Sequence, residues 1–338
     1  MNANIYLHPD TFQYNNKDTI DIVKSKLGDL VDDMTKVVYE HSHENKFKVP
    51  VSLTKIEVFP GHTIFSLAED CLTNDEKGVF YAMMVDTSDS YDTITLEELR
   101  EICKYRSDET EVNSILVFNV PIQDLREEDE EKKTDEDNNK EHQSIVNDYI
   151  VFDKYEVVYS EKTWIHLRRQ ILGNHPGTPD HFVSECRKYF PKLYFHDNCI
   201  SSLIDSNYNY LETSPRKIVY YLSCLNDCFF KWHKSFVGKR HDPNAILSDF
   251  SGQYGLDEAG SIQQNPSKKK DLTFRFHRND KSECDIVCEL HLKISRVDEN
   301  SNVRDIDNKV FHPRIYFYYP EETIEGGRIP VGSIGKHI

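Results

Sequence analysis

The chain has 338 residues, of which 38% are apolar and 12% aromatic, so it can build hydrophobic cores and is not an intrinsically disordered protein. It contains no run of about 18 apolar residues, which excludes a transmembrane helix, and its first residues, MNANIYLHPDTF, lack the basic and apolar regions of a signal peptide. Eight cysteines are too few for a secreted disulfide scaffold of this length. We therefore expect a cytoplasmic protein that makes no contact with a membrane.

Charge is distributed unevenly along the chain. The net charge is −17, which argues against nucleic acid as a partner of the whole protein. Residues 161–338, however, carry 25 Lys and Arg against 23 Asp and Glu, a net charge of +2, so the first 160 residues carry −19. We expect two modules, an acidic one over residues 1–165 and a near-neutral one over residues 166–338.

The acidic module is expected to combine helices and strands. Apolar residues recur at three- and four-residue steps over residues 18–40, which predicts a helix that Asp18 would cap. Further elements follow in chain order: a strand at 51–59, helices at 64–84 and 95–103, and an apolar, β-branched strand at 114–120.

A strongly acidic segment interrupts this module at residues 124–143. It has ten acidic residues against four basic ones and no apolar residue after Leu125, so it is expected to be a disordered loop or linker. Strand patterns resume at 148–160, so the segment is either a long excursion between paired strands or a domain boundary. Its charge favours a regulatory role, in which the acidic module binds a protein partner or the loop competes with nucleic acid for a basic face.

The second module begins with two helices that start at proline. Thr178 and Ser214 are the expected N-caps, and Pro179 and Pro215 are the first helical positions. Residues 251–270 are expected to form a loop. The segments LTFRFH, CDIVCELHLKIS, PRIYFYY and GRIPVGSIG then read as strands separated by polar turns, which favours an antiparallel meander. We therefore expect an α+β protein whose C-terminal helices pack on an antiparallel sheet.

Alternation decides which side chains share a face of this sheet. In CDIVCELHLKIS, residues 284–295, apolar residues occupy one side and polar residues the other, as in one half-buried strand. The residues expected to be catalytic on the open face are His291, Lys293, Arg314 and Tyr316. Those expected to bind nucleic acid around them are Arg275, His277, Tyr318, Lys336 and His337.

This mixture of side chains suits phosphodiester chemistry. A base must take a proton from the attacking hydroxyl, an acid must protonate the leaving oxygen, and fixed cations must stabilise the phosphorane. Aromatic and guanidinium planes would stack single-stranded bases. The alternative is the solvated outer face of an ordinary sheet, stabilised by cross-strand pairs of opposite charge that include Glu289.

The order of elements and motifs in this module resembles the bacterial mRNA-interferase toxins of the RelE type. Two helices precede a meander with His291-x-Lys293 on one strand, Arg314 opening R-I-Y-F on the next, and a short last strand closing on a basic residue. The resemblance covers residues 178–338 and implies that basic and aromatic side chains on the sheet face cleave RNA without a metal. It matches Arg314 to the family's arginine on the central strand, and His337 replaces a frequent terminal tyrosine. The whole chain also resembles bacterial proteins of antiviral defence loci.

Two kinds of metal site compete with this prediction. The Glu-x-Lys motif of metal-dependent restriction-type nucleases has only an aberrant counterpart, His291-x-Lys293 with Asp271. Two cysteine pairs have spacings that would suit zinc, namely Cys224 with Cys228 and Cys284 with Cys288. Both pairs lie on apolar stripes, which favours core thiols over metal ligands.

The sequence therefore predicts a metal-independent ribonuclease-like effector of a bacterial defence or toxin system, with RNA as a partner and without a cofactor. Arg314 and Lys293 would stabilise the phosphate, His291 would be the general base or acid, and Tyr316 would orient or stack. The alternative is a non-enzymatic subunit of a multi-component defence complex, whose sheet face docks a protein or a nucleic acid.

Overall fold

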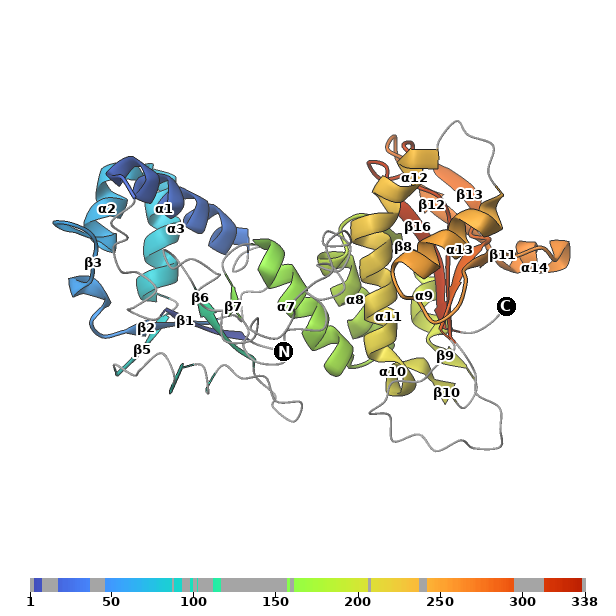
Figure 1. Cartoon of the computed structure of the whole chain (residues 1–338), viewed down its shortest axis with the longest axis horizontal. Helices are drawn as coiled ribbons and strands as arrows, with labels where there is room; N and C mark the ends of the chain where they lie inside the picture. The colour runs from blue at the N-terminus through green and yellow to red at the C-terminus, as the bar shows by residue number, and fades with distance from the viewer. Residues whose placement is uncertain are drawn as a thin grey trace, which may run out of the picture. The chain divides into compact units, whose positions relative to one another are not determined.

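The structure is a computed structural model that divides the chain into two compact units, Met1–Leu167 and Arg168–Ile338. The residues it describes are 3–7, 18–36, 46–86, 88–92, 98–99, 102, 112–116, 157–158, 161–205, 208–236, 242–294 and 313–335. The boundary expected from the sequence lay between residues 165 and 166. Helices and strands in mixed sheets confirm the α+β class (Figure 1).

The first unit is built on a parallel sheet. Its strands are β1 (Ala3–Leu7), β2 (Lys46–Pro50), β5 (Ser88–Tyr91), β6 (Val112–Leu116) and β7 (Val157–Val158). They lie in the order β5-β2-β1-β6-β7, and every pair of neighbours is parallel. Parallel neighbours need crossover connections, which helices usually provide.

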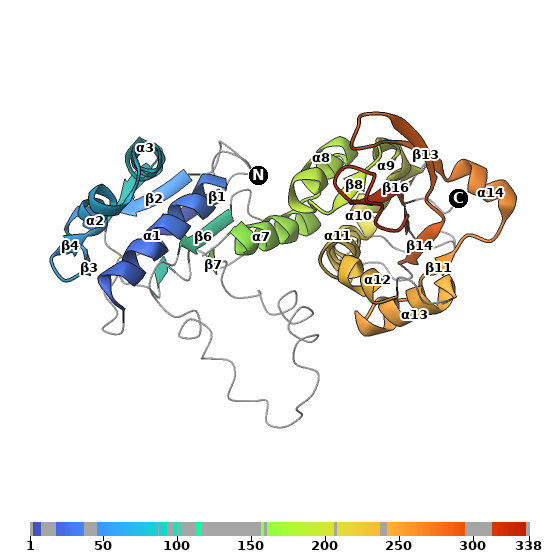
Figure 2. The ribbon, with the colours of Figure 1, turned by 90° about the horizontal axis from the view of Figure 1, so that it is seen from above.

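Three helices lie on one side of this sheet (Figure 2). They are α1 (Ile20–Thr35), α2 (Ile64–Cys71) and α3 (Asn74–Tyr81), which continues into the π-helical turn η4 (Ala82–Asp86). The hydroxyls of Thr19, Thr63 and Thr73 accept backbone N–H groups at their starts, and Thr73 forms a capping box with Glu76. The single helix expected at 64–84 is therefore wrong, because the Thr73 cap begins a second helix.

The strand expected at 51–59 is also wrong over most of its length. The segment contains the 3-10 helix η3 (Leu53–Lys55) and only then β3 (Glu57–Phe59), which pairs with β4 (His62–Thr63). Its two buried residues, Leu53 and Val58, are five positions apart and so cannot lie on one face of a strand. The acidic segment 124–143 lies outside the described residues.

Helices open the second unit, as expected. The first, α7 (Glu161–Asn174), begins in the last residues of the first unit. The others are α8 (Pro179–Tyr189), α9 (Asn198–Ser202), α10 (Tyr210–Thr213), α11 (Pro215–Cys224), the π-helical turn η6 (Leu225–Phe229), α12 (Phe230–Phe236), α13 (Pro243–Gln253) and α14 (Pro266–Asp271). Thr178 caps α8 through its hydroxyl, while Ser214 precedes α11 without a side-chain capping bond. Asn265 caps α14 inside the stretch expected to be a loop. In the part of the chain that the structure describes, no helix is long and apolar enough to cross a bilayer.

The main sheet of the second unit has the order β11-β14-β15-β16-β8. Its strands are β11 (Ser261–Ile262), β14 (Leu290–Lys293), β15 (Arg314–Phe317), β16 (Ile329–Gly335) and β8 (Leu193–Phe195). The first four are antiparallel neighbours, and β8 adds a parallel edge. Separate two-stranded sheets pair β9 (Ile204–Asp205) with β10 (Tyr208–Asn209) and β12 (Thr273–His277) with β13 (Glu283–Val287).

The run 284–295 is not one strand. It breaks at Cys288 and Glu289, where the Glu289 N–H donates to the carbonyl of Val287 at 2.8 Å and the Cys288 N–H to that of Leu272 at 2.9 Å. β13 therefore belongs to the β12–β13 hairpin and β14 to the main sheet. The alternation continues through the break, which is why the sequence alone suggested a single strand.

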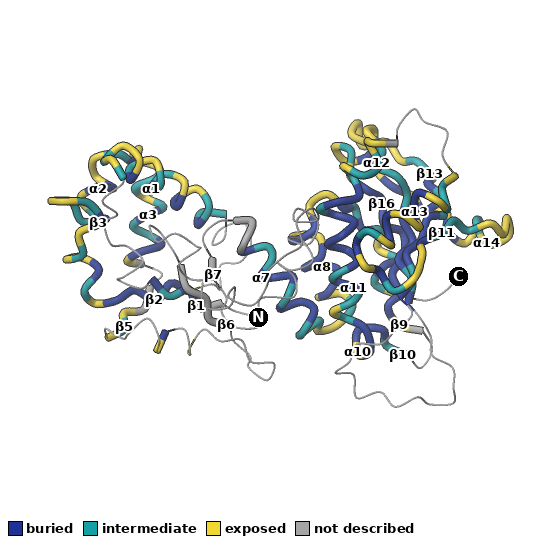
Figure 3. The backbone as a smooth tube through the Cα atoms, viewed as in Figure 1, coloured by how far each residue is buried: buried dark blue, intermediate teal, exposed yellow. Residues whose placement is uncertain are grey.

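Both faces of the main sheet are covered. On one face the ring of Phe229 from η6 contacts Phe317 of β15 edge to face, with centroids 5.1 Å apart. The β12–β13 hairpin packs on the other face, in an apolar cluster formed by Leu272, Phe274, Phe276, Ile286, Cys288, Tyr316 and Ile324. At Gly332 of β16 a Cβ atom would overlap the ring of Phe274. Figure 3 shows β16 buried throughout, while much of α14 is exposed.

Candidate functional site

The register of the main sheet brings the four predicted catalytic residues onto one face. His291 on β14 pairs with Tyr316 on β15, and Lys293 pairs with Arg314. On neighbouring strands, His291 also pairs with Ser261 of β11, and Tyr316 pairs with Ser333 of β16. Arg314 pairs with Gly335 of β16. A polar row, Ser261–His291–Tyr316–Ser333, thus runs across four strands beside the Lys293–Arg314 pair.

His291 is the centre of this row. Its Nε2 lies 2.9 Å from Arg314 Nη1 and 3.0 Å from Ser261 Oγ. The imidazole also contacts the ring of Tyr316, with centroids 5.1 Å apart. A proton-transfer group, a guanidinium and a hydroxyl therefore meet at one point on the sheet.

The expectation of an open face is wrong. His291 is 3% exposed and Tyr316 is fully buried. Tyr316 belongs to the apolar cluster that it forms with the β12–β13 hairpin. Lys293 and Arg314 are only half-buried. The accessible part of the site is therefore its cationic end.

That end carries two positive charges, and no carboxylate in the described part of the chain is bound to either of them. Among the described residues, neither the Lys293 ammonium nor the Arg314 guanidinium forms an ion pair. Arg314 Nε and Ser333 Oγ are buried and have no hydrogen-bond partner in the described part of the chain. Burial lowers the pKa of Arg314, partly offset by Tyr316 and Glu258, yet an arginine remains protonated at neutral pH. Such a site favours an anion that accepts several hydrogen bonds.

Three residues that sequence patterns did not indicate hold this site in place. The Tyr221 hydroxyl on α11 accepts the Asp257 N–H at 2.6 Å and donates to the Lys293 carbonyl at 3.1 Å. Lys217 binds both carboxylate oxygens of Asp257, at 3.0 and 2.9 Å. These hydrogen bonds position the loop that leads to Ser261. Local sequence patterns do not reveal them, because the partners are far apart along the chain.

The residues expected to bind nucleic acid around the site are not all beside it. Arg275 and His277 lie on β12, outside the main sheet, and Arg275 pairs with Glu283 and Asp285 across the hairpin. Tyr318 packs against the apolar cluster beneath the hairpin. Lys336 and His337 lie outside the described residues.

The competing metal sites gain no support. Glu289 forms an ion pair with Lys269. Within the described residues no group of three or more His, Cys, Asp or Glu could hold a metal ion. Burial raises the pKa of Cys224, Cys228 and Cys288, which favours neutral core thiols.

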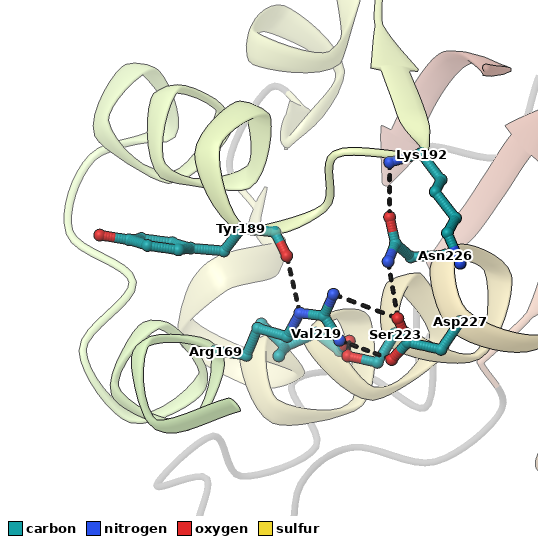
Figure 4. Close-up of polar contacts among 7 residues, drawn as sticks. All are labelled: Arg169, Tyr189, Lys192, Val219, Ser223, Asn226 and Asp227. Carbon is teal, nitrogen blue, oxygen red and sulfur yellow. Dashed lines mark hydrogen bonds and ion pairs between the residues drawn. The ribbon is translucent and has the colours of Figure 1, made fainter. Parts of the chain in front are cut away.

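A second buried polar network surrounds Arg169 of α7 (Figure 4). Its Nε donates to the Tyr189 carbonyl at 2.8 Å, and Nη1 and Nη2 donate to the two carboxylate oxygens of Asp227 at 2.6 and 3.3 Å. Asn226 donates to Asp227 at 2.6 Å and accepts the Lys192 N–H at 2.9 Å. All three guanidinium nitrogens donate within this network, which connects α7, α8 and η6, and the Arg169 charge is paired with Asp227.

Comparison with known proteins does not add a relative: no protein-family model matches the chain, and neither a curated protein nor a solved structure matches it significantly.

Proposed function

We propose that the second unit binds single-stranded RNA through a phosphate group held by Arg314 and Lys293. The observation that carries the proposal is a pair of half-buried cations in cross-strand register, with no ion pair to a carboxylate in the described residues. Phosphate oxygens accept charge-assisted hydrogen bonds from arginine and lysine. Binding of this kind is electrostatic, so it weakens as salt rises.

The nearby hydroxyls support the same ligand. Ser261 Oγ lies within hydrogen-bond reach of His291 Nε2, and Ser333 Oγ is buried without a described partner in the same row. Hydroxyls and a guanidinium together provide donors in several directions, which suits the tetrahedral oxygens of a phosphate.

Metal-independent cleavage of RNA at this site is the second candidate function. It is favoured by the 2.9 Å contact between His291 Nε2 and Arg314 Nη1, which places a general acid or base beside a cation that would hold the phosphate. Because His291 is 3% exposed, cleavage also requires that the residues around the imidazole move to admit the substrate.

The test uses the full chain and a short labelled oligouridylate in EDTA, with binding followed by fluorescence anisotropy. Arg314→Ala and Lys293→Ala should each weaken binding about tenfold or more, as expected for charge-assisted hydrogen bonds. Arg275→Ala is the matched control, because this arginine is exposed and paired with Glu283 and Asp285; it should leave affinity nearly unchanged.

Three results would decide between the candidates. Equal losses in all three variants, or no binding by the wild type, would reject the phosphate site. Binding without strand scission in EDTA would leave a binding module. Scission that disappears in His291→Ala and Arg314→Ala, but not in Arg275→Ala, would establish cleavage.

A further inference from the structure

The loop before β11 passes beside the cationic end of the candidate site. Near its start the Asp257 N–H donates to the Tyr221 hydroxyl at 2.6 Å, and that hydroxyl donates to the Lys293 carbonyl on β14 at 3.1 Å. Glu258 follows directly, and three residues after it the chain enters β11, which pairs with β14. The backbone at Glu258 therefore lies between two points that are both held next to β14.

Hydrogen bonds on both sides hold this loop in place. Lys217 binds the two carboxylate oxygens of Asp257, at 3.0 and 2.9 Å. The carbonyl of Ser251 accepts the Leu256 N–H at 2.9 Å, and its hydroxyl accepts the Gly260 N–H at 2.8 Å. Ser251 is itself buried. The residues between these contacts are thus kept beside the site.

Glu258 brings a negative charge to the cationic end without binding either cation. It is exposed, and it forms no ion pair with Arg314, Lys293 or any other residue in the described part of the chain. Burial lowers the pKa of Arg314, and Tyr316 and the Glu258 carboxylate act against this effect. A carboxylate has such an influence only when its charge lies near the guanidinium. Glu258 can therefore act on an anion held by Arg314 without occupying the donors that bind it.

The size of this effect depends on the charge of the ligand. The repulsion between a carboxylate and a phosphate is proportional to the product of their charges. An internal phosphodiester of RNA carries one negative charge, whereas a terminal phosphate carries close to two above about pH 7. The Glu258 carboxylate therefore opposes a terminal phosphate about twice as strongly as a diester, on the scale of binding free energy.

We infer that Glu258 is a specificity-determining residue of the phosphate site, which shifts its selectivity toward internal phosphodiesters and away from terminal phosphates. This inference rests on the proposed function. Arg314 and Lys293 attract both kinds of phosphate, and Glu258 offsets part of that attraction, more for the doubly charged group. Because the carboxylate is exposed, water and salt screen it, so the expected shift in selectivity is about threefold to tenfold at low salt.

Two nucleotides that differ by one charge provide the test. Uridine 5′-phosphate carries close to two negative charges at about pH 8, and its methyl ester carries one. Each is used to displace a labelled oligouridylate from the full chain, and fluorescence anisotropy gives both inhibition constants for the wild type and for Glu258→Gln. The control is Glu322→Gln, which removes another exposed carboxylate, in the loop that follows the opposite end of β15 from Arg314.

We expect Glu258→Gln to bind both nucleotides more tightly than the wild type does. The gain for uridine 5′-phosphate should exceed the gain for the methyl ester by about threefold to tenfold at low salt, and by much less at about 0.5 M salt. Glu258→Lys should enlarge this difference, because it replaces the negative charge with a positive one. Glu322→Gln should show none.

Equal gains for the two nucleotides, no gain, or the same difference in Glu322→Gln would overturn the inference and leave the proposed function intact. Failure of both nucleotides to displace an oligouridylate whose binding depends on Arg314 would also overturn the inference alone. If no binding depends on Arg314, both proposals are removed.

Discussion

Two buried or half-buried arginines of the second unit differ in how their guanidinium groups are used. Arg169 is 2% exposed and donates from all three nitrogens, to a backbone carbonyl and to the Asp227 carboxylate. Among the described residues Arg314 makes one hydrogen-bond contact, to His291, and its Nε has no hydrogen-bond partner there. Burial of an arginine therefore does not by itself show whether the residue is structural or available to a ligand. The number of its N–H donors that already have partners within the protein distinguishes the two cases.

The first prediction removes the saturated arginine. Arg169→Met should lower the free energy of unfolding by about 4 kcal/mol, because Asp227 and the Tyr189 carbonyl lose a buried charged partner. Urea unfolding measures the change. Arg187→Met is the control, since Arg187 forms an exposed pair with Asp197 and should change stability by less than about 0.5 kcal/mol. Equal losses in the two variants would contradict the structural role of Arg169.

The second prediction concerns Glu185, which binds Arg168 and Lys188. Burial raises the pKa of Glu185, but the hydrogen bonds from Lys188 and Arg168 outweigh burial and lower it overall. This contribution to stability is therefore present above the unfolded value of about 4.3 and is lost as pH falls through the lower folded value. Glu185→Gln should be about 2 kcal/mol less stable than wild type at neutral pH.

The difference between Glu185→Gln and wild type should shrink on acidification. Urea unfolding at a series of pH values from about 7 to about 3 covers the titration of the carboxylate. A difference that stays constant over this range would show that the charge of Glu185 contributes nothing.

The third prediction has the smallest effect on stability. Arg314→Met should change the free energy of unfolding by less than about 1 kcal/mol, or raise it, because it removes a half-buried charge that has no ion-pair partner in the described residues. The same urea series measures it beside Arg169→Met. A loss as large as that of Arg169→Met would show that Arg314 is structural and would sharply weaken the proposed phosphate site.

Local patterns predicted much of the second unit. The Thr178-Pro179 pair correctly predicted the start of α8. The pattern of strands separated by polar turns correctly predicted that β14, β15 and β16 are antiparallel neighbours. They did not show that the run 284–295 changes sheets at Cys288, because alternation is the same on both sides of the break. Nor did they show that the first unit has a parallel sheet, since pairing partners far apart in the chain leave no local signal.

The sequence predicted which residues form the candidate site but not how deeply they are buried or what surrounds them. Alternation alone placed His291, Lys293, Arg314 and Tyr316 on one face, as the register has them. It could not show that His291 and Tyr316 are buried, with Tyr316 packed against the hairpin, nor that Ser261 lies beside His291 on the edge strand β11. The RelE-type resemblance, the defence role and the protein partner of the acidic module stay predictions.

Gly332 also limits how this protein can vary. The ring of Phe274 occupies the space that any other side chain at position 332 would need, so the glycine is required only while the hairpin lies on the sheet. A descendant that shortened or lost the hairpin would be released from this requirement and would at the same time uncover Tyr316 of the polar row. Loss of glycine at this position in a lineage would thus mark proteins whose polar row has become open to solvent.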